Sequence, residues 1–182
     1  MITYDLNGFY NIKVSSWEFV CENNMGKRGR FDGSREEQFV GLIGERMVKY
    51  FFGMPTEITN TGFDGGVDIT LPSGHTFDVK TMTRNVEMRD HYHHNLVASQ
   101  LSYDVDFYVF CTLNKKQNTF TICGYIPKFV FLIASEYYEK GEQIFRDNGT
   151  SFTLQADNAM IEQSKLYPVD NLRGIGIRQH TK

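Results

Sequence analysis

Apolar positions recur with the period of a helix between residues 36 and 52, which is the clearest pattern in the chain. At about 100° per residue, one helical face carries the apolar residues Phe39, Val40, Ile43, Met47 and Tyr50. Ser34 and Glu37 form the Ser-x-x-Glu pattern of a capping box, in which each side chain bonds the backbone N–H of the other residue. Gly53 and Pro55 are typical of a helix end. We therefore predict a helix over residues 36–52.

Alternation of apolar and polar residues downstream of this helix predicts strands. Residues 67–71 and 76–82 alternate on either side of the turn sequence Pro72-Ser73-Gly74, so they predict a hairpin. Residues 106–113 are a nearly continuous apolar run, which is typical of a strand in the centre of a sheet. Residues 119–126 predict a further strand.

The remaining segments carry weaker patterns. Residues 1–25 predict one or two short strands, and residues 56–59 are a candidate strand. A loop followed by a short helix is expected over residues 86–102, a helix over residues 128–140 and a strand over residues 151–154. Together these elements predict an α/β (α+β) fold in which helices flank a mixed central β-sheet.

Length and composition restrict the class of protein. The chain fits a single domain over residues 1–182, and its 41% hydrophobic and 23% charged residues are ordinary for a globular protein. No apolar run approaches the ~20 residues of a membrane helix, and residues 1–5 do not resemble a secretory signal. The three cysteines lack metal-like spacing and favour free thiols in a reducing compartment. These features predict a cytoplasmic protein without membrane contact.

The net charge of −3 does not exclude a nucleic-acid partner, because phosphate binding needs only a local basic patch. Two basic clusters are candidates for such a patch, and a solvated surface is the alternative for each. The first cluster is Lys27-Arg28-Gly29-Arg30 with Arg35, and the second comprises Arg84, Arg89, His91, His93 and His94.

Two aspartates and a lysine in the predicted hairpin are the candidate catalytic group. If the hairpin turns about Ser73, Asp68 lies across from Asp78, because both are equidistant from Ser73. Residues two apart in a strand share a face, so Lys80 points the same way as Asp78. Like charges on opposite strands are destabilising, and a divalent cation would relieve their repulsion. A bound metal activates water and neutralises phosphoryl charge, so this group suits phosphodiester hydrolysis.

The alternative is that both aspartates face solvent and that Lys80 is an exposed ion-pair partner. Aspartate is depleted in strands. Two opposed aspartates in an otherwise good hairpin therefore favour the catalytic interpretation.

The series Asp68, hairpin, Asp78-Val79-Lys80 resembles the PD-(D/E)XK motif of the restriction-endonuclease-like nuclease superfamily. Upstream, Gly41-Leu-Ile-Gly-Glu45 resembles the glutamate-bearing first helix of many members, and the predicted order of helix, three strands, connector and strand agrees. The resemblance implies a restriction-endonuclease-like core over about residues 34–126 with additional elements at both ends. Val67 stands where the motif has its proline, and Asp78 stands where glutamate is commoner.

The resemblance also implies a role for each matching residue. The ligands of Mg²⁺ or Mn²⁺ would be Glu45, Asp68, Asp78 and the carbonyl of Val79, and the catalytic lysine would be Lys80. Glu45 is preferred to Glu37, because the capping box already explains Glu37. An exposed pair with Lys49, at i+4, is the alternative for Glu45.

The expected function is that of a metal-dependent deoxyribonuclease that cleaves as an endonuclease. DNA phosphates are expected to contact basic side chains, namely Arg28, Arg30, Arg35, Arg84, Arg89, His91 and His93. A homodimer is expected if both strands are cut at one position, because one active site hydrolyses one strand at a time. The alternatives are a non-catalytic nucleic-acid-binding or protein-interaction module of the same fold, and a zinc protein that uses His91, His93 and His94.

Overall fold

The computed structural model describes residues 1–27, 33–58, 65–145 and 149–175. The elements, in chain order, are β1 (Ile2–Asp5), η1 (Leu6–Phe9), α1 (Tyr10–Glu22), α2 (Arg35–Phe51), β2 (Ile69–Thr70), β3 (Thr76–Arg84), β4 (His93–Val97), η2 (Ala98–Ser102), β5 (Phe107–Asn114), β6 (Thr119–Pro127), α3 (Lys128–Ala134), β7 (Glu136–Tyr138), β8 (Gln143–Phe145), β9 (Ser151–Thr153), β10 (Asn158–Glu162), η3 (Gln163–Lys165), η4 (Val169–Asn171) and α4 (Leu172–Ile175). No helix within these described ranges is long and apolar enough to cross a membrane.

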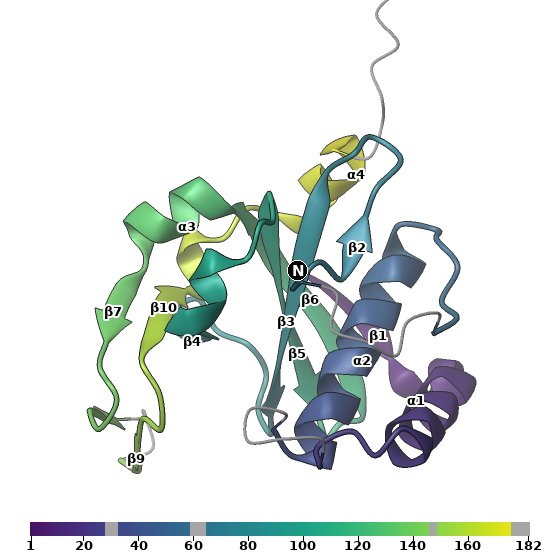
Figure 1. Cartoon of the computed structure of the whole chain (residues 1–182), viewed down its shortest axis with the longest axis horizontal. Coiled ribbons are helices and arrows are strands. Elements are labelled where there is room, and N and C mark those ends of the chain that lie inside the picture. Colours follow the sequence, from purple (N-terminus) through teal and green to yellow (C-terminus); the bar gives the residue numbers. More distant parts are fainter. Residues whose placement is uncertain (28–32, 59–64, 146–148, 176–182) are drawn as a thin grey trace, which may run out of the picture.

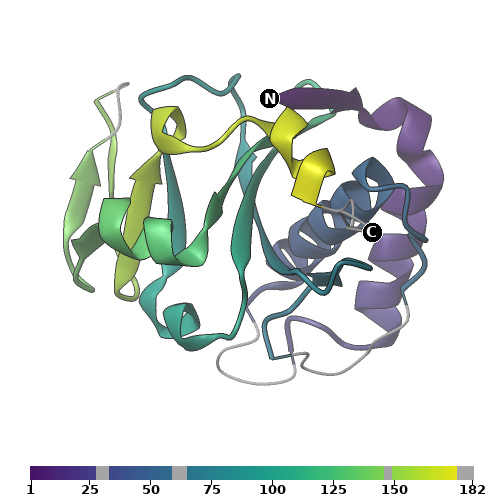
Figure 2. The same ribbon diagram turned by 90° about the horizontal axis from the view of Figure 1, so that it is seen from above.

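A five-stranded mixed sheet in the order β1-β6-β5-β3-β2 runs through the centre of the molecule (Figure 1). Strands β3 and β5 are parallel, and the chain between them contains β4 and η2. The other neighbouring strands of this sheet are antiparallel. Figure 2 shows α1 and α2 on one side of the sheet, and α3 with a second sheet, β4-β10-β7, on the other. The predicted mixed α/β architecture is therefore confirmed.

Each face of the central sheet covers its own hydrophobic core. Phe77 and Val79 of β3 join the core beneath α1 and α2. Tyr108 of β5 joins the core on the other face, together with residues of β4, β10 and α3. Because successive residues of a strand point to opposite faces, Asp78 and Lys80 lie on the same face as Tyr108.

The helix predicted over residues 36–52 is confirmed as α2. Its N-terminus has the predicted capping box, in which Glu37 N–H donates to Ser34 Oγ at 3.2 Å and Ser34 N–H donates to Glu37 Oε2 at 2.6 Å. The buried residues of its predicted apolar face are Val40, Ile43 and Met47. Local capping and periodicity thus agree with the packing that this helix reaches.

Most predicted strands are confirmed. Residues 76–82, 106–113, 119–126 and 151–154 correspond to β3, β5, β6 and β9. The first hairpin strand, predicted over residues 67–71, is shorter than expected, because β2 contains two residues.

Three predictions of secondary structure are correct only in part. Residues 1–25 contain one short strand, β1, as predicted, but Tyr10–Glu22 form the helix α1, because Ile12, Ser16 and Val20 are buried at helical spacing. The helix predicted over residues 128–140 ends at Ala134, because the following residues pair with β10 as β7. The short helix predicted at the end of residues 86–102 corresponds to η2, but His93–Val97 before it form the strand β4, which also pairs with β10.

The candidate strand over residues 56–59 is absent as far as the structure describes it. Residues 56–58 have no strand partner, and Thr59 lies outside the described residues. One of the three strands that the resemblance implies before the connector is therefore not seen.

Candidate active site

Asp78 and Lys80 lie on one face of β3 and form an ion pair. The Lys80 Nζ atom is 2.6 Å from Asp78 Oδ1. The Asp78 side chain is 1% exposed and that of Lys80 is 19% exposed. The carboxylate is therefore inside the protein, and the Lys80 side chain beside it is partly exposed.

The hairpin has the register that the sequence predicts. Ile69 pairs with Phe77 and Thr70 pairs with Thr76, so the two strands turn about Ser73. The regular pairing nevertheless ends before Asp68. Strand β2 is too short to cover the rest of β3, which leaves the edge of β3 beyond Phe77 without a main-chain partner from β2.

The Asp68 side chain occupies this edge of β3. Its Oδ2 atom accepts a hydrogen bond from the backbone N–H of Val79 at 2.6 Å. The N–H and C=O groups of one strand residue face the same edge, as they do when a residue exchanges both bonds with a partner. The carbonyl of Val79 therefore points to the same edge as the Asp68 carboxylate.

A glycine fixes the chain just before Asp68. Gly66 has a φ of +85°, and a Cβ at this position would lie 2.1 Å from the Tyr103 ring. Only glycine fits this combination of positive φ and close approach. Two residues later, the backbone N–H of Asp68 donates to the carbonyl of Phe77 at 3.0 Å. The tight turn and this bond together direct Asp68 toward β3.

A second glycine brings α2 close to β3. A Cβ on Gly44 would lie 1.8 Å from Thr81 Oγ1 and 3.5 Å from a methyl carbon of Val79. The helix can approach the strand this closely because Gly44 has no side chain. The next residue in the helix is Glu45, and its charge contributes to the raised pKa of Asp68. Glu45 therefore lies near Asp68, while Glu37 is used in the helix cap.

The carboxyl group of Asp68 is held in an environment that disfavours its charge. Burial raises its pKa well above the usual value, and the charges of Glu45 and Asp78 raise it further. The hydrogen bond from Val79 and the charge of Lys80 oppose this shift without cancelling it. Asp68 is thus the centre of an acidic group in which each charge destabilises the others.

Tyr108 is a member of the site that the sequence analysis did not identify. It is the neighbour of Asp78 across the parallel β3–β5 pairing and is fully buried. Burial and the charge of Asp78 raise the pKa of Tyr108 to about 12. No described residue forms a hydrogen bond with its hydroxyl oxygen. The register between β3 and β5 depends on a long connection, so no local signal in the sequence places Tyr108 beside Asp78.

The donor set fits a hard divalent cation in its chemistry. Glu45, Asp68 and Asp78 supply carboxylate oxygens and Val79 supplies a carbonyl, which are the ligands that Mg²⁺ and Mn²⁺ prefer. A cation would also relieve the repulsion at Asp68. In the arrangement observed, no three acidic, histidine or cysteine side chains among the described residues are close enough to hold a metal ion together. The acidic group is therefore near to a metal site without being a preformed one.

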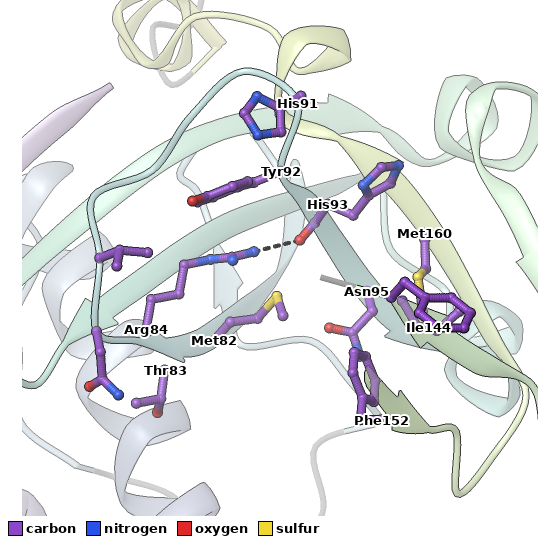
Figure 3. A pocket seen from close by; sticks show the side chains of 13 residues that line it. Met82, Thr83, Arg84, His91, Tyr92, His93, Asn95, Ile144, Phe152 and Met160 are labelled. Atoms are coloured by element: carbon purple, nitrogen blue, oxygen red, sulfur yellow. Dashed lines mark hydrogen bonds between the residues drawn. The ribbon is translucent and has the colours of Figure 1, made fainter. Parts of the chain in front are cut away.

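Part of the second basic cluster gathers around a cavity further along β3. Arg84, His91 and His93 all line a cavity of about 500 Å³ (Figure 3). Arg89 lies close by, with its guanidinium carbon 5.8 Å from the centroid of the Tyr92 ring. The residues of this cluster that the sequence predicts to contact phosphates therefore lie close together at the cavity.

The other basic candidates lie elsewhere. Arg35 is the first residue of α2 and does not line the cavity. Arg28 and Arg30 lie outside the described residues. His94 is fully buried and its Nε2 atom is 2.8 Å from Gln163 Oε1, so it faces away from His93. The histidine zinc site therefore finds no support in the described part of the chain.

Comparison of the chain with protein-family models, with curated proteins and with solved structures gives no match. In this structure Asp68 contacts the edge of β3, Lys80 pairs with Asp78 on the same strand, and the charges of Asp78 and Glu45 both act on Asp68.

Proposed function

We propose that this protein is a metal-dependent nuclease of the PD-(D/E)XK type, which hydrolyses phosphodiester bonds in DNA. The observation that carries the proposal is the position of Asp68. Its carboxylate is tied to the backbone of Val79 and exposed to the charges of Glu45 and Asp78. Three neighbouring carboxylates do not stabilise a fold when one of them is buried and, in the part of the chain that the structure describes, has no counter-ion of its own. A bound cation is therefore the simplest reason for this acidic group.

Each residue of the candidate site has a proposed role in metal binding or in catalysis. Asp68, Asp78 and Glu45, with the carbonyl of Val79, would hold Mg²⁺ or Mn²⁺. When bound, the cation would neutralise charge on the phosphoryl group and acidify a water molecule. Lys80 is paired with Asp78 and partly exposed, so its ammonium group would donate hydrogen bonds to a phosphate oxygen and stabilise charge in the transition state.

The proposed function includes the contacts with DNA, the position of cleavage, the oligomeric state and the cellular location. Arg84, Arg89, His91 and His93 would contact the DNA backbone, and cleavage would be endonucleolytic. A homodimer would be needed if both strands were cut at one position. A cytoplasmic location fits the three free cysteines of the structure, of which Cys111 and Cys123 are buried.

The test is a cleavage assay with supercoiled, linear and single-stranded DNA in Mg²⁺, Mn²⁺ or EDTA. Wild type is compared with Lys80→Ala and with the control Lys115→Ala, which removes an exposed lysine paired with Glu36 at 2.6 Å. We expect metal-dependent relaxation of supercoiled DNA by wild type and by Lys115→Ala. Loss of a group that stabilises transition-state charge should reduce the rate about 10²–10³-fold in Lys80→Ala.

Equal activity of both lysine variants and wild type would contradict the role of Lys80 or indicate a contaminating nuclease. Folding of each variant is checked by circular dichroism. Folded wild type that cleaves none of the substrates in any metal would instead favour the non-catalytic module.

A further inference from the structure

The cavity of about 500 Å³ lies next to the proposed catalytic group on the same strand. Met82 and Arg84, which line it, follow Lys80 along β3 at intervals of two residues. Because strand residues two apart share a face and are about 6.6 Å apart, the cavity begins one step beyond Lys80. Its volume is typical of pockets for small molecules, which span about 300–1,000 Å³.

One wall of the cavity is basic and aromatic. The guanidinium carbon of Arg84 lies 5.1 Å from the centroid of the Tyr92 ring. Figure 3 shows the Tyr92 ring next to the Arg84 guanidinium group. Arg84 Nη2 also donates a 2.6 Å hydrogen bond to the carbonyl of His93. These contacts hold the guanidinium group in place, and the imidazoles of His91 and His93 stand on the same side.

The opposite wall is apolar and comes from the second part of the chain. Ile144 of β8, Phe152 of β9 and Met160 of β10 line it. Phe152 keeps 38% of its surface exposed. Asn95 of β4 lies beside Phe152 in Figure 3 and adds an amide, a group that can bond the edge of a base.

We propose that this cavity holds an unstacked base of the DNA strand that is cleaved, next to the scissile phosphate. The proposal rests on the nuclease function above, because it takes Lys80 to mark the reacting phosphate. An aromatic and apolar slot suits the face of a base, whereas arginine and histidines at its rim suit a phosphate. A base inside a duplex is stacked and cannot enter such a slot. The preferred substrate is consequently single-stranded or unpaired at the cleavage site.

The test measures binding separately from cleavage. Fluorescence anisotropy in EDTA, at one fixed salt concentration, compares a labelled oligothymidylate strand with a duplex of equal length. Three variants are used: Phe152→Ala, Phe152→Leu, which keeps apolar volume without a ring, and the control Phe129→Ala. Phe129 is 68% exposed on α3 and does not line the cavity.

We expect wild type and Phe129→Ala to bind the single strand more tightly than the duplex. Because stacking of a base on an aromatic ring contributes about 1–3 kcal/mol, Phe152→Ala should weaken single-strand binding about 5- to 150-fold. Phe152→Leu should lose much of the same affinity, and duplex binding should change little in either variant.

Two results separate this inference from the proposed function. Tighter binding of duplex, with both Phe152 variants like wild type, would overturn the inference even if Lys80-dependent cleavage is observed. Single-strand binding that depends on Phe152, without metal-dependent cleavage, would keep the base pocket and overturn the nuclease.

Discussion

The Asp68 carboxylate accepts a 2.6 Å hydrogen bond from the backbone N–H of Val79, so a side chain stands where a neighbouring strand would otherwise pair. Strand β2 begins only at Ile69. The part of the β3 edge that β2 leaves uncovered is contacted by the Asp68 side chain rather than by main chain. The arrangement places a largely buried acidic group at the edge of β3. It also leaves Asp68 exposed to two other negative charges.

Removal of the Asp68 charge is expected to stabilise the protein in the absence of metal. Because the pKa of Asp68 is raised by burial and by Glu45 and Asp78, the folded state binds its proton more tightly than the unfolded state. The free energy of unfolding therefore decreases as pH rises through the folded-state pKa of Asp68. Asp68→Asn should raise Tm in EDTA at pH 7.5 by a few degrees, since 1 kcal/mol moves Tm by about 2–4 °C in a domain of this size.

The control for this measurement is Asp106→Asn. Hydrogen bonds from Thr76 lower the pKa of Asp106, so its charge is favoured in the folded state, and the variant should not gain stability. Mn²⁺ should raise Tm of wild type and of Asp106→Asn but not of Asp68→Asn. A lower Tm for Asp68→Asn in EDTA would contradict the electrostatic strain at this residue.

The close approach of α2 to β3 makes Gly44 a sensitive position. A methyl group there would lie 1.8 Å from Thr81 Oγ1 and 3.0 Å from Thr81 Cβ, so Gly44→Ala must displace the Thr81 side chain or the helix. Overpacking of this kind costs about 1–3 kcal/mol. Gly41→Ala, in the same helix with no atom within 4 Å of its new Cβ, should instead gain about 0.5–1 kcal/mol. Urea unfolding of the two variants measures both changes, and equal effects would contradict the contact.

His94 is expected to make stability depend on pH below neutrality. Burial lowers its pKa to about 4, although a hydrogen bond to Gln163 opposes the shift. The unfolded chain, with an imidazole pKa of about 6.5, then binds more protons, so stability falls as pH falls from about 6.5 toward 4. Between pH 7.5 and 5 the loss should be about 2 kcal/mol in the free energy of unfolding.

Urea unfolding at these two pH values tests the effect of His94. His94→Phe should show a smaller pH-dependent loss than wild type, and His75→Phe, which replaces an exposed imidazole, is the control. The same dependence in both variants would assign the pH effect to other groups.

Arg46 is expected to be a structural residue despite its charge. Its side chain donates to the carbonyls of Ile12 and Thr56 at 2.9 and 2.7 Å and to Ser15 and Ser16 at 2.8 Å each. The side chain thus joins α2 to α1. Arg46→Met should lower the free energy of unfolding by about 2–4 kcal/mol, because hydrogen bonds to a charged group contribute about 1.5–3 kcal/mol each.

Lys49→Met is the matched control for Arg46→Met in the same helix and should change stability by less than about 0.5 kcal/mol. Denaturant midpoints of the two variants decide between them. A loss of stability in Arg46→Met no larger than in the control would show that these bonds contribute little.

Local signals in the sequence were enough for the elements that carry the site. Ser34 and Glu37 define the start of α2, since a capping box involves only residues three apart. The turn about Ser73 fixes the register of the hairpin, and strand alternation then puts Lys80 on the face of Asp78. These features are short-range and could be predicted.

Long-range packing decided the rest. Residues after Ala134 extend as a strand because β10 offers a partner, which no pattern within residues 128–140 reveals. The charge of Glu45 acts on Asp68 because Gly44 allows α2 to pack closely against β3. Tyr108 lies beside Asp78 because β3 and β5, which are far apart in the chain, pair in parallel. Local patterns along the chain predict which residues are candidates for the chemistry and how the hairpin pairs. The distances between the charges and the cavity beside them follow only from the packed fold, because both depend on contacts between segments far apart in the chain.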